Sequence, residues 1–165
     1  MLKNIVIDDL NYIKNKLNDE NKNLSESTIL ITGCAGFLGF YFLNYLNFFF
    51  DELNIKRVIG LDNFLIRKPE WINKLKPNKS IEIINFNIVQ DDISKLENAK
   101  NVDYIFHLAS VASPSFYRRY PLETIDSNIW GLRKLLDFYN QKEIKGILFF
   151  SSSEIYGDPK KENIP

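Results

Sequence analysis

The stretch TGCAGFLG, residues 32–39, constrains the fold of this 165-residue chain more than any other. It places Gly33, Gly36 and Gly39 at three-residue spacing, directly between a short apolar run and a longer helical one. In this context Gly33 permits a tight turn, Gly36 lets backbone N–H groups approach a pyrophosphate, and Gly39 lets the helix pack close to the sheet. The helix N-terminus adds partial positive charge for phosphates. An ordinary tight turn is the alternative.

Apolar runs typical of strands alternate with helical patterns along the chain. The predicted strands are 28–33, 57–62, 81–86, 103–109 and 146–152, and the predicted helices after the first strand are 37–53 and 122–141. This alternation indicates βαβ units with a parallel sheet, and the nearly continuous apolar strands indicate that both faces are covered. Right-handed crossovers then predict an α/β fold, a doubly wound parallel sheet (Rossmann fold) ordered 3-2-1-4-5.

The first 27 residues differ from the rest. They carry apolar residues at helical spacing, Val6, Leu10, Ile13 and Leu17. This spacing predicts an amphipathic helix over 4–18, followed by the polar linker NDENKNLSES, residues 18–27. We therefore divide the chain into an N-terminal helix with its linker, 1–27, and a nucleotide-binding domain, 28–165.

Composition excludes several classes of function. Lys+Arg and Asp+Glu are both 21, so no net charge favours nucleic acid or an anionic membrane surface. The most apolar stretch, 37–50, is broken by polar residues and is shorter than the roughly 20 residues of a membrane span. The single cysteine, Cys34, excludes an internal disulfide and indicates a reducing, cytoplasmic location. We predict no metal site.

Asp62 ends the second predicted strand, next to Asn63. A carboxylate there can accept hydrogen bonds from both hydroxyls of an adenine ribose and repels a 2′-phosphate, which favours NAD over NADP. Arg67 lies near enough to keep NADP as an alternative, and an aspartate of a strand-end turn is the other alternative. His107, within an apolar strand, is interpreted as packed or cofactor-adjacent rather than as a proton-transfer group, and Cys34 as a small loop residue rather than a nucleophile.

The glycine loop, Asp62-Asn63, His107-Leu108-Ala109 and the run SSSEIYG (151–157) together resemble the extended short-chain dehydrogenase/reductases, the NAD-dependent sugar-nucleotide epimerases and dehydratases. The resemblance covers residues 28 to 165. It implies NAD as the cofactor, a nucleotide-sugar substrate and a homodimer of the complete protein, formed in part by the 122–141 helix. The cofactor contacts that it implies are Gly33, Gly36, Phe37, Leu38, Gly39, Asp62, Asn63, Asn87, Ile88, Leu108, Ala109, Ser110 and Thr124.

Within that family, the segment from Ala109 to Gly131 looks most like the UDP-glucuronate decarboxylases. The residues that carry this likeness are Ala109-Ser-Val-Ala-Ser-Pro114, Tyr117, Tyr120-Pro121, Thr124 and Asn128-x-x-Gly131. Ser113, Pro114 and Tyr117 are the substrate contacts implied. Two residues depart from the pattern: Glu123 stands where Lys is usual, and Asn87 where an Asp commonly meets the adenine amino group, a bond that an amide oxygen can also accept. A 4-epimerase, a 4,6-dehydratase and a non-catalytic NAD-binding protein remain alternatives.

The resemblance implies oxidation of the sugar at C4 with NAD⁺, loss of CO₂ from the resulting 4-keto acid, and reduction to UDP-xylose. Ser152 would hydrogen-bond the reacting C4 oxygen. Glu154 would lie over the sugar, with a role in ring distortion or proton handling. Ser153 stands where the dTDP-glucose 4,6-dehydratases carry the Asp that protonates the departing hydroxyl, which argues against them.

Tyr156 and Lys160 have the spacing of the catalytic Tyr-x-x-x-Lys pair, but Gly157-Asp158-Pro159 between them predicts a turn instead of the required helix. Tyr12 and Lys16 are a second chance match, on the helix before the nucleotide fold. We therefore expect the chain to end before the catalytic helix and the substrate domain, and to be inactive alone. The fifth strand would then present an apolar edge.

Overall fold

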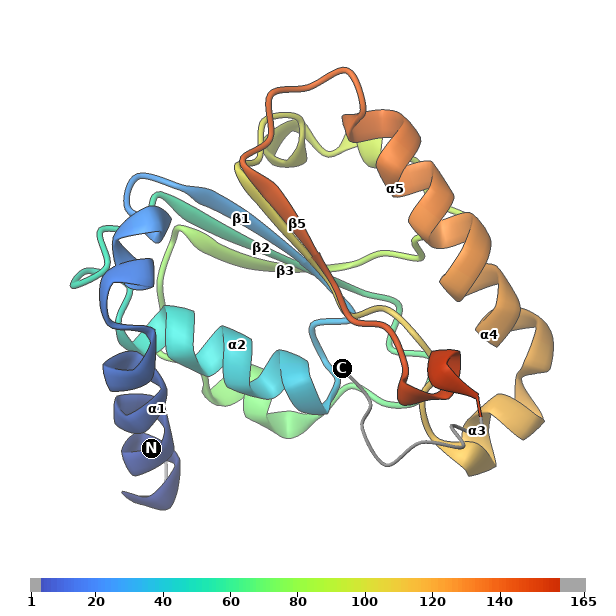
Figure 1. The fold of residues 1–165 in the computed structure, drawn as a ribbon, viewed down its shortest axis with the longest axis horizontal. Coiled ribbons are helices and arrows are strands. Elements are labelled where there is room, and N and C mark those ends of the chain that lie inside the picture. The colour runs from blue at the N-terminus through green and yellow to red at the C-terminus, as the bar shows by residue number, and fades with distance from the viewer. Residues whose placement is uncertain (1–3, 158–165) are drawn as a thin grey trace.

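The structure is a computed structural model that describes residues 4–157. At its centre is a five-stranded parallel sheet in the order β3-β2-β1-β4-β5 (Figure 1). The strands are β1 (Thr28–Thr32), β2 (Arg57–Asp62), β3 (Ile81–Asn85), β4 (Tyr104–His107) and β5 (Gly146–Phe149). This confirms the predicted fold class and strand order.

Helices cover both faces of the sheet, with α2 on one side and α5 on the other (Figure 1). The α-helices are α1 (Asn4–Leu17), α2 (Phe37–Phe48), α3 (Pro114–Arg119), α4 (Pro121–Asp126) and α5 (Leu132–Tyr139). A π-helical turn, η5 (Ser127–Gly131), joins α4 to α5. Short 3₁₀ turns are η1 (Asn18–Leu24), η2 (Glu70–Lys74), η3 (Ile93–Lys95), η4 (Glu97–Ala99) and η6 (Ser153–Tyr156).

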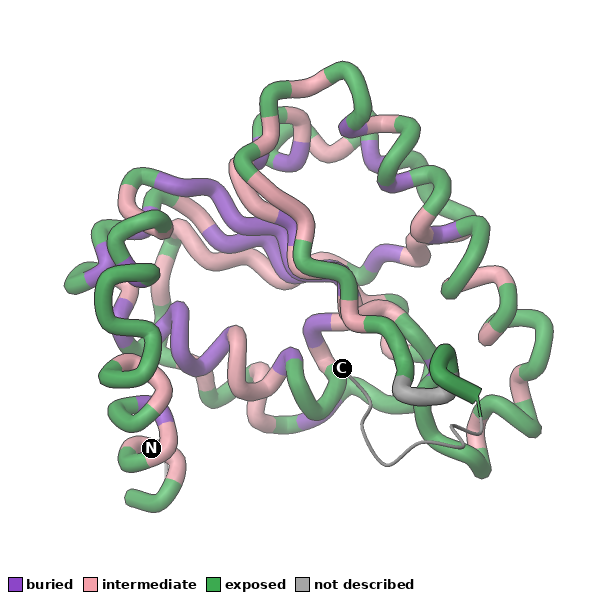
Figure 2. Tube along the Cα trace, viewed as in Figure 1, coloured by how far each residue is buried: buried purple, intermediate pink, exposed green. Residues whose placement is uncertain are grey.

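The core lies on both faces of β1, whose five residues are all buried (Figure 2). Ile29 and Ile31 belong to the cluster on the α2 side, while Leu30 belongs to the cluster on the α5 side. Burial of each such side chain contributes roughly 1.5–3 kcal/mol, so the central strand anchors both layers. The edge strands are less covered, and Leu148 and Phe149 of β5 are 46% and 48% exposed. The predicted apolar edge at β5 is thus confirmed.

The N-terminal region packs on the nucleotide fold through α1 and η1. Leu10 is fully buried in the cluster that contains α2. The hydroxyl of Tyr45 in α2 donates to Asn21 Oδ1 at 2.6 Å, and Asn21 Nδ2 donates to the carbonyl of Lys14 at 3.1 Å. The predicted linker is therefore largely a 3₁₀ turn that ties α1 to α2. In the part of the chain that the structure describes, no helix has both the length and the apolar character needed to cross a bilayer.

Three features differ from the sequence prediction. The helix expected over 122–141 is divided by the π-helical turn, and α2 ends at Phe48, five residues before the expected end. The sequence of this helix predicts an apolar face formed by Leu132, Leu135, Leu136 and Tyr139, but Leu136 is 39% exposed. Leu135 and Tyr139 are four residues apart and share the face toward the sheet, whereas Leu136 is turned about 100° from that face.

Candidate cofactor site

The candidate site lies at the carboxyl ends of the parallel strands. The glycine loop follows β1, Asp62 ends β2, Asn87 follows β3, and Leu108 follows β4. Because all these strands are parallel and in register, their carboxyl ends lie together. Doubly wound sheets bind ligands at these carboxyl ends, beside the strand from which the chain continues first to one side of the sheet and then to the other. Here that strand is β1, with β2 on one side and β4 on the other.

The glycine loop fits closely between β1, β2 and β4. Gly33 has a φ of +69°, and a Cβ on it would lie 2.7 Å from the backbone of Ala109. A Cβ on Gly39 would lie 2.2 Å from the carbonyl oxygen of Cys34. The N–H groups of Gly33 and Cys34 donate to the carbonyl of Leu61 at 2.8 and 3.3 Å. Both roles expected for these two glycines, tight turn and close packing, therefore follow from the geometry.

The loop ends at the N-terminus of α2, which is open to an anion. The N-cap of this 12-residue helix is Gly36, which has no side chain that could cap the first N–H groups. Within the described residues, the N–H groups of Phe37, Leu38 and Gly39 have no acceptor. Unpaired N–H groups at a helix N-terminus and the helix dipole together favour a phosphate. The residues expected to bind the pyrophosphate therefore stand where donors are available.

Asp62 is held rigidly beside this loop. Its Oδ2 accepts from the N–H of Ala35 at 2.9 Å, and its Oδ1 accepts from the N–H of Phe64 at 2.8 Å. Burial raises the pKa of the Asp62 carboxyl, while these two N–H groups oppose the rise. Each oxygen has a second lone pair, so a fixed carboxylate can still accept from ribose hydroxyls. Asn63 accepts from the N–H of Leu65 and shapes the same loop.

A tight turn follows β3 and carries Asn87 and Ile88. Asn87 Oδ1 accepts from the N–H groups of Val89 and Gln90 at 3.0 and 3.2 Å. The amide oxygen expected to meet an adenine amino group is thus already occupied by the turn itself. Asn87 Nδ2 and the N–H of Ile88 have no partner among residues 4–157, so donors are the groups this turn can offer to a base.

A buried polar network joins the ends of β1 and β4. Thr32 Oγ1 lies 2.8 Å from His107 Nδ1 and accepts from the N–H of Ala109 at 3.3 Å. His107 is buried and stacked on Phe149, and burial lowers its pKa to about 4. A neutral imidazole locked in this network supports the interpretation of His107 as a packed residue. Thr32 was not singled out from the sequence, because a threonine that ends a strand carries no distinctive pattern.

The connection after β4 and the helices that follow it carry the three expected substrate contacts, Ser113, Pro114 and Tyr117, and two of the expected cofactor contacts, Ser110 and Thr124. Ser110 and Ser113 are exposed, Pro114 begins α3, and Tyr117 lies in the same short helix. Ser113 Oγ lies 3.2 Å from the Oγ of Ser115, and Thr124 Oγ1 donates to the carbonyl of Tyr120 at 2.6 Å. The roles toward a ligand stay predictions for Ser110, Ser113, Pro114, Tyr117 and Thr124.

The end of β5 leads into the short turn η6, which contains Glu154 and Tyr156. Ser152 is exposed at the start of this turn, and its carbonyl accepts from the N–H of Ile155 at 3.3 Å. Gly157 has a φ of +64°, which ends any right-handed helix directly after Tyr156. Lys160 lies outside the described residues. Of the turn predicted between Tyr156 and Lys160, Gly157 lies within the described residues, and Asp158 and Pro159 lie outside them.

Across the described residues, no group of three or more His, Cys, Asp or Glu side chains is placed to hold a metal ion. Cys34 is buried under the glycine loop, and burial raises its thiol pKa far above the ordinary value. A thiol held in this form is a poor nucleophile, in agreement with its interpretation as a small loop residue.

A doubly wound sheet, a glycine loop that opens a helix, and an acidic residue at the end of β2 define a dinucleotide-binding Rossmann protein. Residues 29–165 match the model of the NAD dependent epimerase/dehydratase family. The chain belongs to this family, whose cofactor is NAD.

Among curated relatives, UDP-glucuronic acid decarboxylase 1 of Arabidopsis thaliana is 34% identical over 131 residues, which are 79% of this chain and 27% of the plant protein. An uncharacterized protein of Methanocaldococcus jannaschii is 32% identical over 81% of this chain and 42% of its own length. The chain therefore spans less than half the length of these relatives.

Two solved structures show the same architecture. A UDP-N-acetylglucosamine 4-epimerase from Methanobrevibacter ruminantium superposes with a TM-score of 0.69 at 26% identity, over 86% of this chain and 43% of that one. The enzyme WbmF of Bordetella bronchiseptica, solved in complex with NAD⁺, gives a TM-score of 0.60 at 25% identity, over 76% of this chain and 36% of that one.

Proposed function

We propose that this chain is the NAD-binding part of a nucleotide-sugar modifying enzyme that resembles the UDP-glucuronate decarboxylases. In this proposal residues 28–165 bind NAD and the first part of the substrate, and residues 1–27 add a helix that packs on α2. The observation that carries the proposal is the 34% identity to a UDP-glucuronic acid decarboxylase over 131 residues. This chain matches only 27% of the length of that relative, which supports the proposal that the catalytic helix and substrate domain belong to a longer protein.

The described residues fit NAD. The loop backbone is close-packed at Gly33, the α2 N-terminus offers free N–H groups, and Asp62 offers a fixed carboxylate. When bound, NAD⁺ would supply reversible hydride transfer at the sugar C4. Asp62 orients the cofactor by holding its adenine ribose, and the helix N-terminus stabilises its pyrophosphate charge.

The chain's own contribution at the sugar comes from two segments. Ser152, at the exposed end of β5, would donate or accept a hydrogen bond at the C4 oxygen and so fix the hydroxyl for proton transfer. Glu154 would lie over the sugar ring. Ser113, Pro114 and Tyr117, in the segment after β4, would also contact the substrate. None of these groups replaces the tyrosine and lysine that such chemistry requires.

A 4-epimerase is the second candidate. The observation that favours it is the superposition with a UDP-N-acetylglucosamine 4-epimerase at a TM-score of 0.69. The sequence at the end of β5, Ser152-Ser153-Glu154, instead resembles the decarboxylases, so we place the epimerase second.

Products distinguish these candidates. The reading frame extended beyond Pro165 should be expressed and incubated with NAD⁺ and a panel of UDP-sugars, with products identified by mass spectrometry. We expect UDP-xylose and CO₂ from UDP-glucuronate, and no product from residues 1–165 alone. A C4 epimer without loss of CO₂ would establish the second candidate. No product from any sugar, with NAD⁺ still bound, would indicate a non-catalytic NAD-binding protein.

We also propose that the complete protein is a homodimer, with the outer face of α4, η5 and α5 in the interface. Four large apolar side chains of this face are exposed: Leu122, Ile125, Ile129 and Trp130. Exposed large apolar side chains that follow one another along a helix are typical of a protein interface.

Ile129→Asp should therefore convert a dimer of the extended protein to a monomer, because it buries an unpaired charge in the interface. Sedimentation velocity at micromolar concentration measures this change. Ile5→Asp is the matched control, since Ile5 is also an exposed isoleucine but lies on α1, and it should leave the dimer intact. A dimer that survives Ile129→Asp would place the interface elsewhere.

A further inference from the structure

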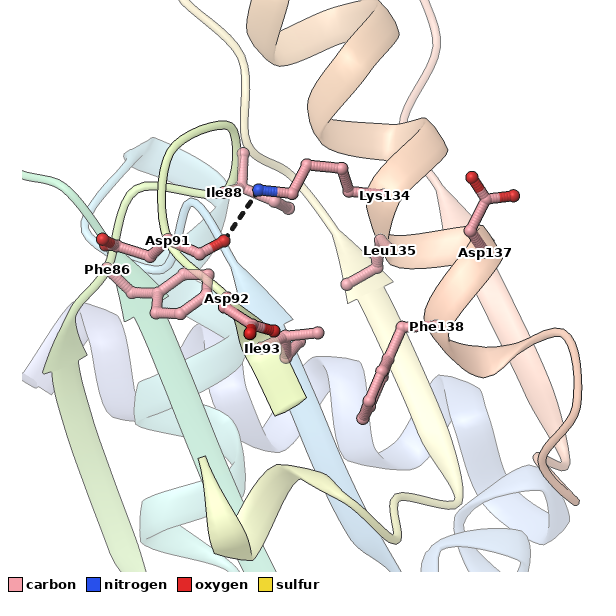
Figure 3. Close-up of a pocket in the computed structure, with 9 residues that line it drawn as sticks. All are labelled: Phe86, Ile88, Asp91, Asp92, Ile93, Lys134, Leu135, Asp137 and Phe138. Carbon is pink, nitrogen blue, oxygen red and sulfur yellow. Dashed lines mark hydrogen bonds between the residues drawn. The ribbon is translucent and has the colours of Figure 1, made fainter. Parts of the chain in front are cut away.

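The turn after β3 is fastened to α5 by one lysine. Lys134 Nζ donates to the carbonyl of Val89 at 2.6 Å. It also donates to the carbonyl of Asp91 at 2.8 Å, the bond drawn in Figure 3. The same turn is closed internally, because the N–H of Asn87 donates to Asp91 Oδ2 at 2.7 Å. A single ammonium group therefore satisfies two carbonyls on the turn that carries Asn87 and Ile88.

The side chains beneath the turn do not pack fully against α5, so the hydrogen bonds from Lys134 hold the turn in place. A cavity of about 180 Å³ lies between the turn and α5, lined by Ile88 and Phe86 on one side and by Leu135 and Phe138 on the other (Figure 3). The apolar side chains of the turn and of α5 therefore do not fill the space between them, and fewer apolar contacts hold the turn here. Besides Lys134, Gly131 of the π-helical turn also contacts the turn after β3. A Cβ on Gly131 would lie 2.6 Å from Ile88 Cγ2, so Ile88 packs directly on the helix backbone.

We propose that Lys134 is a positioning residue for the adenine end of the NAD site. It touches neither Asp62 nor the glycine loop. It acts by fixing the turn whose Ile88 N–H and Asn87 Nδ2 remain available to a base edge. Phe86 connects this turn to Asp62, the residue expected to bind the adenine ribose, since the N–H of Phe86 donates to the carbonyl of Asp62 at 3.0 Å. The inference rests on the cofactor site described above.

The test compares two ligands that differ only in the base edge. NAD⁺ and nicotinamide hypoxanthine dinucleotide are titrated by calorimetry into the unaltered chain, Lys134→Met, Lys134→Arg and the control Arg133→Met. Methionine keeps the length of the apolar stem but cannot donate, whereas arginine can still donate to two carbonyls. Arg133 neighbours Lys134 on α5 but pairs with Asp137 at 2.8 Å and does not reach the turn.

We expect Lys134→Met to weaken NAD⁺ about tenfold and the hypoxanthine analogue less than about threefold. Adenine N1 can accept from the N–H of Ile88, whereas N1 of hypoxanthine carries a hydrogen and cannot, so the analogue has no such contact to lose. Lys134→Arg should restore most of the preference for NAD⁺, and Arg133→Met should change neither ligand. The melting temperature without ligand should fall by no more than a few degrees.

Equal weakening of both ligands in Lys134→Met, or no weakening of either, would overturn the proposal. An unaltered chain that does not distinguish the two bases would overturn it as well. Failure of the unaltered chain to bind NAD⁺ at all is a different result, because it would contradict the cofactor site itself.

Discussion

Gly33→Ala should destabilise the chain by about 3 kcal/mol or more and abolish measurable NAD⁺ binding. A left-handed backbone at a residue with a Cβ costs about 1–3 kcal/mol, and forcing extra atoms into a packed site costs about the same again. Here φ is +69° and the Cβ would lie 2.7 Å from the backbone of Ala109, which cannot rotate away as a side chain does. Thermal unfolding followed by circular dichroism should show a melting temperature lower by about 10 °C.

Gly36→Ala is the matched control for this substitution. Gly36 has a φ of −74°, and a Cβ there would lie 3.3 Å from the carbonyl of Gly33, so a small adjustment accommodates it. This variant should melt close to the unaltered chain but bind NAD⁺ more weakly, because its methyl group occupies the space needed by the pyrophosphate. If Gly33→Ala melted like Gly36→Ala, the close approach of β4 to the loop would be refuted.

Asp62→Ala should weaken NAD⁺ by roughly 1–3 kcal/mol, about 5- to 150-fold, through loss of the ribose hydrogen bonds. NADP⁺ should not weaken, because removal of the carboxylate also removes its repulsion of a 2′-phosphate. The carboxylate also accepts from Ala35 and Phe64, so the melting temperature of the variant is measured alongside. Asp51→Asn, an exposed change after α2 and away from the site, is the control and should bind like the unaltered chain.

The sheet could be predicted from the sequence because the signals for its strands and crossovers are local. Each strand is a short apolar run, each crossover is long enough for a helix, and handedness then leaves few strand orders. The roles of Gly33 and Gly39 followed from their position between a strand and a helix. Asp62 was found in the same way, as the acidic residue at the end of the second strand.

Features that depend on tertiary packing were not predictable. The π-helical turn before α5 brings Gly131 against Ile88, a contact between residues far apart in the chain. The bonds from Lys134 to Val89 and Asp91 span more than 40 residues and leave no periodic signal. Asn87 was expected to offer its amide oxygen to a base, but the turn uses that oxygen for two of its own N–H groups.

The most direct test of the cofactor site is calorimetric titration of NAD⁺ and NADP⁺ into the unaltered chain and into Asp62→Ala. The site described here predicts that the unaltered chain binds NAD⁺ more tightly than NADP⁺, and that Asp62→Ala loses most of this preference. Equal or tighter binding of NADP⁺ by the unaltered chain, or an undiminished preference for NAD⁺ in Asp62→Ala, would contradict it.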